Sequence, residues 1–537
     1  MASKLVKGTL ILSIATLLTR MIGALFWVPF QNIAGDEIVG LYKVSFPLYA
    51  TLLVIASAGV PLTVSKFVSE RLSKGDHLNA RRVLKAASII LSITGLVLAL
   101  SLYLGADFVA NVMLHNPTTK ASLQVLALAI VFVPLMAVLR GYFQGHQNMM
   151  PTGISQVVEQ ILRVVTVIVL TYYMVEAGFS SEQISAGATA GAFTGAIGGL
   201  LVVLWYNLRD KREWRKKVQQ QPPTDPEPLW PLIKKILAFS IPISLGSLVY
   251  PMIQFLDSAT VPRLLQWMGH NLSMANTLYG IYGRGEPFVN LIQSFSVAIS
   301  LSLVPAISAY VAKKEMAAVS RTISQAWLMT LIVSLPASLM VTVLAKPLNI
   351  MMYKDDKGWF PLAILAFAAI FSTVATASTG ILQGLGYNKI PVQNLIIGGI
   401  VKVIGNFIYI PLIGIAGSAL SMVICYLVVC ILNMWAVLEK TQTRVKYTQI
   451  FIKPTICGVI MSIFLYFAYI GMEHLVDPTG NLRLTYTWMS IVLGLFGGIV
   501  FFITLLLTKT LGENEVRLLP MGNRLLHIFR RLHLIRA

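Results

Sequence analysis

The chain has 537 residues, of which 56% are hydrophobic and only 12% are charged. About a quarter of the residues in a soluble domain are charged, so this composition excludes an ordinary soluble protein and indicates one that crosses a membrane many times. The formal net charge of +20 would suit nucleic acid as a partner, but the distribution of the charge along the chain argues against it.

Fourteen stretches are apolar and long enough to span a bilayer. A spanning helix needs about 20 apolar residues, because it rises about 1.5 Å per residue across about 30 Å of hydrocarbon. By this measure the sequence predicts an all-α polytopic membrane protein with 14 transmembrane helices. Their approximate ranges are 8–31, 42–65, 84–108, 122–142, 153–174, 184–207, 232–256, 286–310, 322–345, 360–383, 391–410, 413–437, 450–471 and 485–508.

The positions of lysine and arginine predict the orientation of these helices. With the N-terminus in the cytoplasm, the segments expected to be cytoplasmic hold 31 of the 42 basic residues, and the external loops hold six. Both ends of the chain are therefore expected in the cytoplasm. Since the excess charge follows the membrane topology, nucleic acid is not an expected partner.

Two stretches about 239 residues apart share one pattern, which predicts a tandem duplication. In each, an apolar helix ends in Gly–x–x–Gln–Gly, and a short polar turn with a proline leads into the next apolar helix. Glycine permits tight turns and close packing, so a structural role is favoured over substrate contact by the glutamines. The motif residues are Gly141, Gln144, Gly145 and Pro151 in the first copy and Gly380, Gln383, Gly384 and Pro391 in the second.

The duplication predicts two six-helix pseudo-repeats followed by two extra helices. Since six is an even number, both repeats enter the membrane from the same side, and an axis along the membrane normal is expected to relate them. The tail mixes arginines with leucines, which suits a helix on an anionic membrane surface and equally a solvated basic tail. The expected parts are an N-lobe (1–208), a cytoplasmic linker (209–231), a C-lobe (232–438), helices 13 and 14 (439–512) and a basic amphipathic cytoplasmic tail (513–537).

No catalytic constellation is visible in the sequence. It contains no Walker-type glycine loop and no Gly–x–Ser–x–Gly motif, and its seven histidines do not pair at metal-ligand spacing within a span. Cys425, Cys430 and Cys457 lie in apolar runs and are expected to be small buried hydrophobes. The sequence thus predicts a protein that is not an enzyme and that needs neither a cofactor nor a metal.

Charged side chains inside the helices are the candidate functional residues, because they are costly in hydrocarbon unless they face water or a partner. Arg20 lies in the middle of the first predicted helix, and Arg284 lies with Glu286 at the start of the eighth. An arginine can bind a phosphate through two parallel hydrogen bonds, so both are candidates for an anionic substrate. Neutralisation of each by a nearby carboxylate or helix end is the alternative.

Two further sets of intramembrane charges stand out. Glu159 and Arg163 are four residues apart with the glutamate first, which predicts a helical ion pair with a structural role. Lys402 and Asn406 share one face of the eleventh helix. A lone lysine in hydrocarbon needs a partner, and Asp257 on the seventh helix is the expected one; substrate phosphates are the alternative.

The helix count, the duplication and the Arg20–x–x–Gly23 signature resemble the multidrug/oligosaccharidyl-lipid/polysaccharide exporter superfamily. The segment RGYFQGHQNMMPT, which starts at Arg140, is similar to the stage V sporulation protein B branch, whose relatives include MurJ-like lipid II flippases. The resemblance implies two lobes around a cationic cavity in a bacterial plasma membrane. It also implies a flippase that moves an undecaprenyl-pyrophosphate-linked cell-wall precursor outward by alternating access, with cell-wall synthesis or division proteins as partners.

Residue by residue, the resemblance implies that Arg20 and Arg284 bind the substrate. Two other arginines of the family are absent, since Phe26 and the region of Thr51 stand in their places, and Lys43 is the candidate that compensates. In sodium-binding relatives, a helix-7 aspartate and polar helix-11 residues hold the cation. A lysine stands at the similar helix-11 position here, which implies that an ammonium group replaces the ion.

Two other functions stay open. One is a proton- or sodium-coupled multidrug antiporter of the same fold, and the other is a structural scaffold for cell division or spore assembly. Within the predicted helices, five basic residues stand against three acidic ones. This balance favours an anionic substrate over a cationic drug, and a scaffold would have no use for intramembrane arginines.

Overall fold

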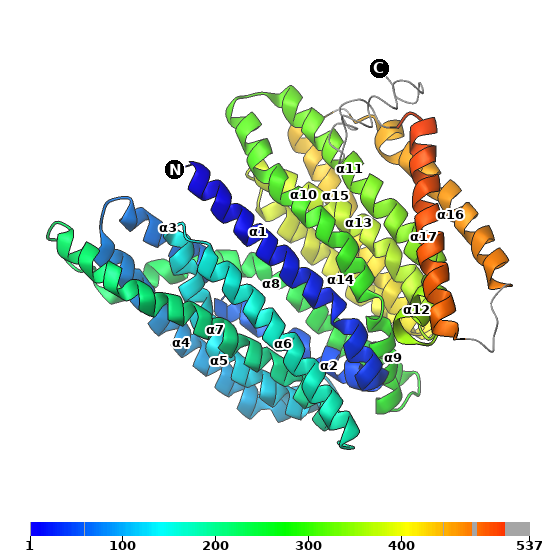
Figure 1. Cartoon of the computed structure of the whole chain (residues 1–537), viewed down its shortest axis with the longest axis horizontal. Helices are drawn as coiled ribbons and strands as arrows, with labels where there is room; N and C mark the ends of the chain where they lie inside the picture. Colours follow the sequence, from blue (N-terminus) through cyan, green and yellow to red (C-terminus); the bar gives the residue numbers. More distant parts are fainter. Residues whose placement is uncertain (1, 58, 444, 475–480, 511–537) are drawn as a thin grey trace. The chain divides into compact units, whose positions relative to one another are not determined.

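A computed structural model describes residues 2–57, 59–443, 445–474 and 481–510. All regular elements in these ranges are helices, so the expected all-α fold is confirmed (Figure 1). The chain forms two compact units, one that ends at Gly283 and one that begins at Arg284. The basic tail predicted for residues 513–537 lies outside the described residues.

The first unit holds helices α1 to α9. They are α1 (Ala2–Leu25), α2 (Trp27–Ser57), α3 (Val60–Leu72), α4 (His77–Phe108), α5 (Lys120–Gly145), α6 (Met150–Glu176), α7 (Ser181–Gln220), α8 (Leu229–Trp267) and α9 (Leu272–Gly283), with a π-helical turn at Val109–Met113 and a 3₁₀ turn at Pro117–Thr119. Its core lies among α3, α4, α5, α7 and α8 and is built from residues such as Val64, Val83, Leu139, Phe143 and Ile236.

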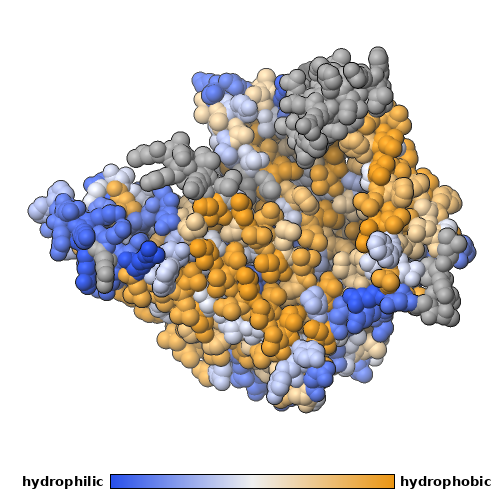
Figure 2. All heavy atoms as spheres, viewed as in Figure 1, coloured by the Kyte–Doolittle hydropathy of each residue, from blue (hydrophilic) through white to orange (hydrophobic). Residues whose placement is uncertain are grey.

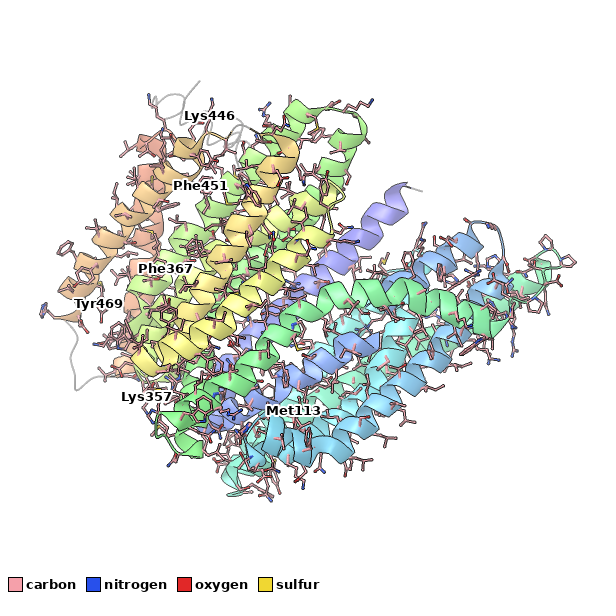
Figure 3. The ribbon with its side chains drawn as sticks, turned by 180° about the vertical axis from the view of Figure 1, so that it is seen from behind. Met113, Lys357, Phe367, Lys446, Phe451 and Tyr469 are labelled. Carbon is pink, nitrogen blue, oxygen red and sulfur yellow. The ribbon has the colours of Figure 1, made fainter. Side chains whose placement is uncertain are left out.

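The second unit holds helices α10 to α17. They are α10 (Glu286–Ala312), α11 (Met316–Val343), α12 (Ala345–Tyr353), α13 (Trp359–Gly384), α14 (Lys389–Ile413), α15 (Ile415–Thr441), α16 (Lys453–Glu473) and α17 (Leu482–Leu507), with a π-helical turn at Thr448–Ile452. Trp327 is fully buried in the core, and its indole N–H donates to the Ser378 hydroxyl over 2.9 Å. Figure 3 places Lys357, which follows α12, and Lys446, which follows α15, at opposite ends of this unit.

Twelve stretches of the described chain are long and apolar enough to cross a membrane, and a bent helix pair in α8 raises the number to 13. One of the twelve, Ile11–Leu72, has 62 residues and covers nearly all of the first two predicted helices. At about 1.5 Å per residue such a stretch is long enough to cross a bilayer twice. The predicted number of 14 helices is not confirmed as such, but the multi-pass architecture is.

Backbone breaks divide two of the long helices. Gly35 has φ 79° and ψ 170°, a conformation that glycine adopts without strain, and it divides α2 into two segments. In α8, the segments Leu229–Leu245 and Ser247–Trp267 meet at 50°. Pro251 follows a few residues beyond the bend and cannot donate the backbone hydrogen bond of an unbroken helix.

The two repeats use their Gly–x–x–Gln–Gly motifs in the same way. A methyl group added to Gly141 would lie 2.6 Å from the Pro61 carbonyl oxygen, and one added to Gly380 would lie 2.9 Å from that of Ser300. Pro61 and Ser300 are separated along the chain by the same interval as the two glycines. The duplication predicted from sequence therefore recurs in the packing of α5 on α3 and of α13 on α10.

The turn after each motif is also repeated. Four residues separate α5 from α6, and four separate α13 from α14. Each turn has one residue with positive φ at the equivalent position, Gln147 with 57° and Gly386 with 89°. Pro151 and Pro391 lie in the first turn of the helix that follows, where a missing backbone N–H costs no helical hydrogen bond. The predicted turns are thus present in both units.

The polar segment between the repeats is held against the α3–α4 turn. Arg71 donates two hydrogen bonds to the Glu227 carboxylate, over 2.9 and 2.6 Å. The side-chain amide of Asn79 donates to the Asp225 carbonyl oxygen, and its oxygen accepts from the Glu227 N–H. These contacts bring α8 into the first unit. The compact units therefore do not divide at 209–231, and the lobes defined by the duplication stay a prediction.

Hydrophobic side chains cover the flanks of the helices, and hydrophilic ones gather at helix ends, as at the α3–α4 turn and the end of α7 (Figure 2). Many of the large exposed residues on these flanks are Leu, Ile, Phe or Trp. An apolar flank between polar ends is what a hydrocarbon layer requires of a spanning protein. The three cysteines are buried, as expected.

Candidate functional site

Within the first unit, α2 crosses α9 at a pair of glycines, Gly40 and Gly280, that hold equivalent positions in the two repeats. A methyl group on Gly40 would collide with the Asn276 carbonyl oxygen, and one on Gly280 would collide with that of Asp36. Asp36 and Asn276 also hold equivalent positions in the two repeats. Each repeat therefore contributes one glycine and one carbonyl oxygen to a pair of equivalent contacts. Reciprocal contacts of this kind indicate a local two-fold relation between α2 and α9.

The crossing brings a buried lysine close to two aromatic rings. The ammonium nitrogen of Lys43 lies 5.3 Å from the ring centroids of both Tyr279 and Tyr282. Its repeat equivalent is Gly283, and a methyl group there would lie 2.7 Å from the lysine nitrogen. Glycine in one copy of the repeat thus makes room for the cation in the other, and the tyrosine rings stabilise it through cation–π contacts.

Arg20 lies on α1, which packs along α6 in the same unit. Its side chain is exposed, and it makes no hydrogen bond or ion pair with the residues that the structure describes. Gly23 allows this packing, since a methyl group there would lie 3.1 Å from the Gln160 amide nitrogen. Arg20 therefore has the donors that an anionic ligand would need.

Arg284, by contrast, is neutralised within the second unit. It is buried and donates to both carboxylate oxygens of Asp355 and, over 3.0 Å, to the Lys357 carbonyl oxygen. Tyr353 donates its hydroxyl hydrogen to the Arg284 carbonyl oxygen over 3.0 Å. Partial burial raises the pKa of the Asp355 carboxyl, but the hydrogen bond from Arg284 and its positive charge outweigh this, and the pKa is lowered. Glu286 begins α10, where a carboxylate stabilises the helix dipole.

Glu159 and Arg163 form the expected ion pair, 2.7 Å apart on α6. The structure adds a third member, because Arg140 on α5 donates to the other Glu159 oxygen over 2.9 Å. Arg140 also donates to the Ser155 hydroxyl, which in turn donates to the Gly199 carbonyl oxygen on α7. The cluster joins three helices and has a net charge of +1.

The sequence contained a signal for Arg140 that the prediction missed. Arg140 and Ser155 are equally distant from the middle of the α5–α6 turn, and residues with this spacing face each other in an antiparallel helix pair. Glu159 lies one helical turn beyond Ser155 on the same helix. The sequence prediction uses only the charge of Arg140 and therefore assigns it to the basic residues at the cytoplasmic ends of the helices. No such spacing marks Asp355, Tyr279 or Tyr282, which lie on other elements than the residues they contact.

Lys402 is fully buried on α14 in the second unit. Its ammonium group donates to the carbonyl and hydroxyl oxygens of Ser418 on α15, over 3.2 and 3.3 Å, and lies 3.5 Å from the Asn406 side-chain oxygen. Asp257 is buried on α8, in the first unit. The contact between Asp257 and Lys402 therefore stays a prediction, whereas the shared face of Lys402 and Asn406 is present.

The remaining motif residues have structural surroundings. Gly145 lies against Ser65 and Val68 of α3, and Gly384 lies against the equivalent residues of α10, Val304 and Ile307. Gln144 is half-buried and Gln383 is exposed. No group of three or more His, Cys, Asp or Glu side chains suited to a metal ion occurs in the described part of the chain.

Comparisons with known proteins identify the family to which this chain belongs. A sequence profile of the polysaccharide biosynthesis protein family matches residues 5–311, more than half of the chain. The chain belongs to this family. A second profile, MatE, matches residues 242–408, which include most of the second repeat. Both profiles place the chain in the multidrug/oligosaccharidyl-lipid/polysaccharide exporter superfamily, which the sequence resembles.

Three relatives from Bacillus subtilis cover most of this family member. An uncharacterized membrane protein, YabM, is 30% identical over 98% of this chain and 96% of its own length. The lipid II flippase MurJ is 28% identical over 86% of this chain and 87% of its own. Stage V sporulation protein B is 26% identical over 97% of this chain and 98% of its own.

A solved structure of a lipid II flippase MurJ in an inward closed conformation has the same fold. It covers 92% of this chain and 99% of its own, with a TM-score of 0.66 and 16% identity. The relatives and this fold together identify a multi-pass membrane protein of the flippase and transporter kind that this superfamily contains.

Proposed function

We propose that this protein moves an undecaprenyl-pyrophosphate-linked cell-wall precursor, lipid II or a related lipid-linked oligosaccharide, across the bacterial plasma membrane by alternating access. The similarity to a lipid II flippase over most of both chains is the observation that carries the proposal. A pyrophosphate is anionic, and the intramembrane side chains Arg20 and Lys43 supply positive charge for it. Phosphate oxygens accept hydrogen bonds from guanidinium and ammonium groups.

Arg20 is the first candidate for the pyrophosphate. Its guanidinium group is exposed and has no competing partner among the described residues. Lys43 supplies a second positive charge, from a buried position next to the rings of Tyr279 and Tyr282. Arg284 would have to leave Asp355 before it could bind a phosphate, so it would serve the substrate in another state of the transport cycle.

A multidrug antiporter is the second candidate, and the MatE profile match over residues 242–408 favours it. An antiporter that ejects cations needs acidic side chains along its path. The exposed intramembrane charge of α1 is an arginine instead, and the Glu159 carboxylate is bound by two arginines. Positive groups repel a cationic drug, so the charge balance supports the anionic substrate.

Depletion of the protein in its host tests the proposal. If it is a flippase for this class of substrate, cells without it should accumulate an undecaprenyl-linked precursor on the inner leaflet. The precursor is measured by extraction and mass spectrometry, and its leaflet by accessibility to an external enzyme. Unchanged precursor pools, together with greater sensitivity to cationic dyes, would favour the antiporter.

Variants of Arg20 and Arg284 test the binding of the pyrophosphate. Arg20→Ala should abolish complementation while the protein still reaches the membrane, and Arg20→Lys should restore it only in part because the two-pronged geometry is lost.

Asp355→Asn is the matched control for Arg284→Ala. If Arg284 serves only its ion pair with Asp355, both variants should lose activity equally. If Arg284 binds substrate, Asp355→Asn should retain activity that Arg284→Ala loses. Normal growth with Arg20 and Arg284 both replaced by alanine would refute the role of the arginines.

A further inference from the structure

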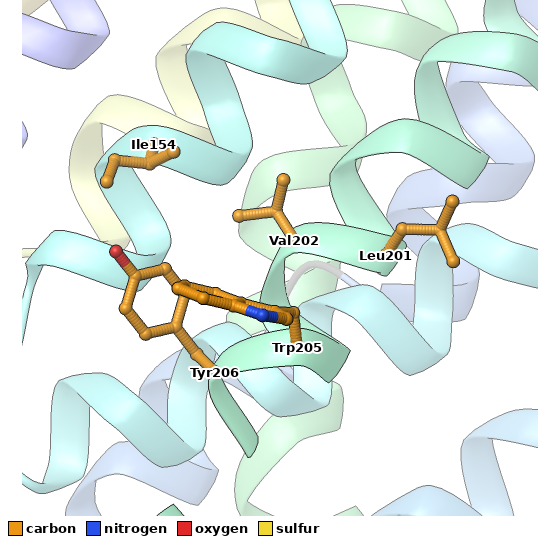
Figure 4. A pocket seen from close by; sticks show the side chains of 5 residues that line it. All are labelled: Ile154, Leu201, Val202, Trp205 and Tyr206. Atoms are coloured by element: carbon orange, nitrogen blue, oxygen red, sulfur yellow. The ribbon is translucent and has the colours of Figure 1, made fainter. Parts of the chain in front are cut away.

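An apolar groove lies on the first unit where the second half of α7 packs along the start of α6 (Figure 4). It has a volume of about 460 Å³ and is open to its surroundings. Trp205 and Tyr206 lie side by side in it, with their ring centroids 4.8 Å apart. The lining residues are Ile154 from α6 and Leu201, Val202, Trp205 and Tyr206 from α7.

The groove lies near one edge of the membrane-spanning part of α7. That part ends at Lys211, and the helix continues as far as Gln220. Tryptophan and tyrosine concentrate at membrane–water interfaces, because their rings are apolar while their N–H and O–H groups bind water. Trp205, which is 54% exposed, therefore marks the level where acyl chains meet headgroups.

A cation lies one helical turn beyond this level. The guanidinium carbon of Arg209 is 5.7 Å from the centroid of the Trp205 ring, and its side chain is exposed. Further along α7, the exposed basic residues outnumber the acidic ones, Asp210 and Glu213. These basic residues are Lys211, Arg215, Lys216 and Lys217. Basic clusters directly beyond a membrane span attract anionic headgroups.

We propose that this groove binds one anionic phospholipid of the leaflet that meets the α5–α6 turn. One acyl chain lies on Ile154, Leu201 and Val202 and against the face of Trp205. The phosphate group accepts hydrogen bonds from Arg209. An apolar groove alone would take the chain of any lipid, so the selectivity for a negative headgroup comes from the arginine above it.

Quenching of tryptophan fluorescence by brominated lipids tests this site. The full chain is placed in phosphatidylcholine vesicles, and part of the lipid is replaced by phosphatidylglycerol or phosphatidylcholine with dibrominated chains. The signal of Trp205 is the difference between the wild-type protein and Trp205→Phe. Phosphatidylglycerol should quench Trp205 at a mole fraction about fivefold lower than phosphatidylcholine, the effect expected of one basic residue at the surface.

Arg209→Gln should remove this preference, so that both brominated lipids quench Trp205 equally. Lys234→Gln is the matched control, because the Lys234 ammonium also lies over an exposed tryptophan, 5.5 Å from the Trp230 ring, but on α8 and not at this groove. The control should leave the quenching of Trp205 unchanged. Equal quenching by the two lipids in the wild-type protein would overturn the proposal, and so would equal losses from Arg209→Gln and Lys234→Gln.

Discussion

Arg163 and Lys402 occupy the same position in the two repeats, yet their charges are met in different ways. Arg163 pairs with Glu159, which also binds Arg140. Lys402 has Gly398 at the position of Glu159 and is bound by Ser418 and Asn406 instead. Each repeat therefore has a cation in the middle of its fifth helix. A carboxylate stabilises this cation in the first repeat, and neutral oxygen atoms stabilise it in the second.

Loss of the Glu159 carboxylate should destabilise the first unit strongly. Glu159→Gln would leave Arg140 and Arg163 next to each other without a counter-ion, and removal of one partner from a buried ion pair costs about 3–5 kcal/mol. The expected result is a large fall in folded yield and in Tm, measured by thermal unfolding in detergent.

A second change at the same cluster distinguishes charge from shape. Glu159→Gln combined with Arg163→Met should recover part of the lost stability, because the second substitution removes one of the two unpaired cations. Glu176→Gln, at the exposed end of α6, is the control and should have little effect. If Glu159→Gln is as stable as the wild-type protein, the cluster contributes nothing to folding.

The Lys402 ammonium lies where a coupling cation would be bound, according to the family resemblance, and we propose that it replaces that ion. Transport by the wild-type protein should then be independent of a sodium gradient. Lys402→Ala should introduce a sodium requirement, because the oxygens of Ser418 and Asn406 become available to a cation.

Lys389→Ala, at the exposed start of α14, is the control for Lys402→Ala and should leave the dependence on sodium unchanged. The measurement is transport of a lipid-linked sugar in vesicles with and without a sodium gradient. Wild-type transport that follows the sodium gradient would contradict the proposal.

At the scale of helices, glycine determines which pairs can pack closely. Gly141 and Gly145 let α5 approach α3, and Gly380 and Gly384 let α13 approach α10. The contact atoms include a backbone oxygen at each of the four glycines, and a backbone oxygen cannot move away as the end of a flexible side chain can. The same interface is thus needed in both units.

Gly141→Ala and Gly380→Ala should each destabilise the protein, by about 1–3 kcal/mol, because an added methyl group overpacks the interface. Gly105→Ala on α4 and Gly498→Ala on α17 are the controls, since a methyl group at either position meets nothing within 4 Å. Alanine favours helix, so the controls should be neutral or slightly stabilising. The measurement is the Tm of all four variants by thermal unfolding. Equal Tm values for the motif variants and the control variants would disprove the close packing.

At the scale of the whole molecule, the basic residues predict a single orientation. Reporter tags in the 219–227 linker and at Lys446 should be cytoplasmic, and a tag at Asp355 should be external. The arrangement of the second unit agrees with this, because Lys357, close to Asp355, and Lys446 lie at opposite ends of it (Figure 3). Protease or thiol-reagent accessibility in intact cells and in inverted vesicles measures the orientation. A tag at Asp355 and one at Lys446 on the same side would contradict the predicted topology.

The class of the protein, the duplication, the helix–turn–helix motifs and the Glu159–Arg163 pair could all be predicted from the order of the residues. All of these depend on local properties: hydropathy along a span, spacing within one helix, and the repetition of a pattern at a fixed interval. The same locality explains why most of the predicted spans lie within single observed helices. Breaks such as Gly35, whose positive φ no hydropathy pattern records, are not predicted.

Apart from local pairs such as Glu159 and Arg163, the groups that neutralise the charged residues could be identified only in the folded chain. Folding pairs Arg284 with Asp355, 71 residues away, and places Lys43 next to the rings of Tyr279 and Tyr282. It also places α8 and α9 in the first compact unit, although the duplication assigns them to the second repeat. A buried charge is stabilised by whatever group lies within a few ångströms of it, and that depends on which helices pack together, a property of the folded chain rather than of any stretch of its sequence.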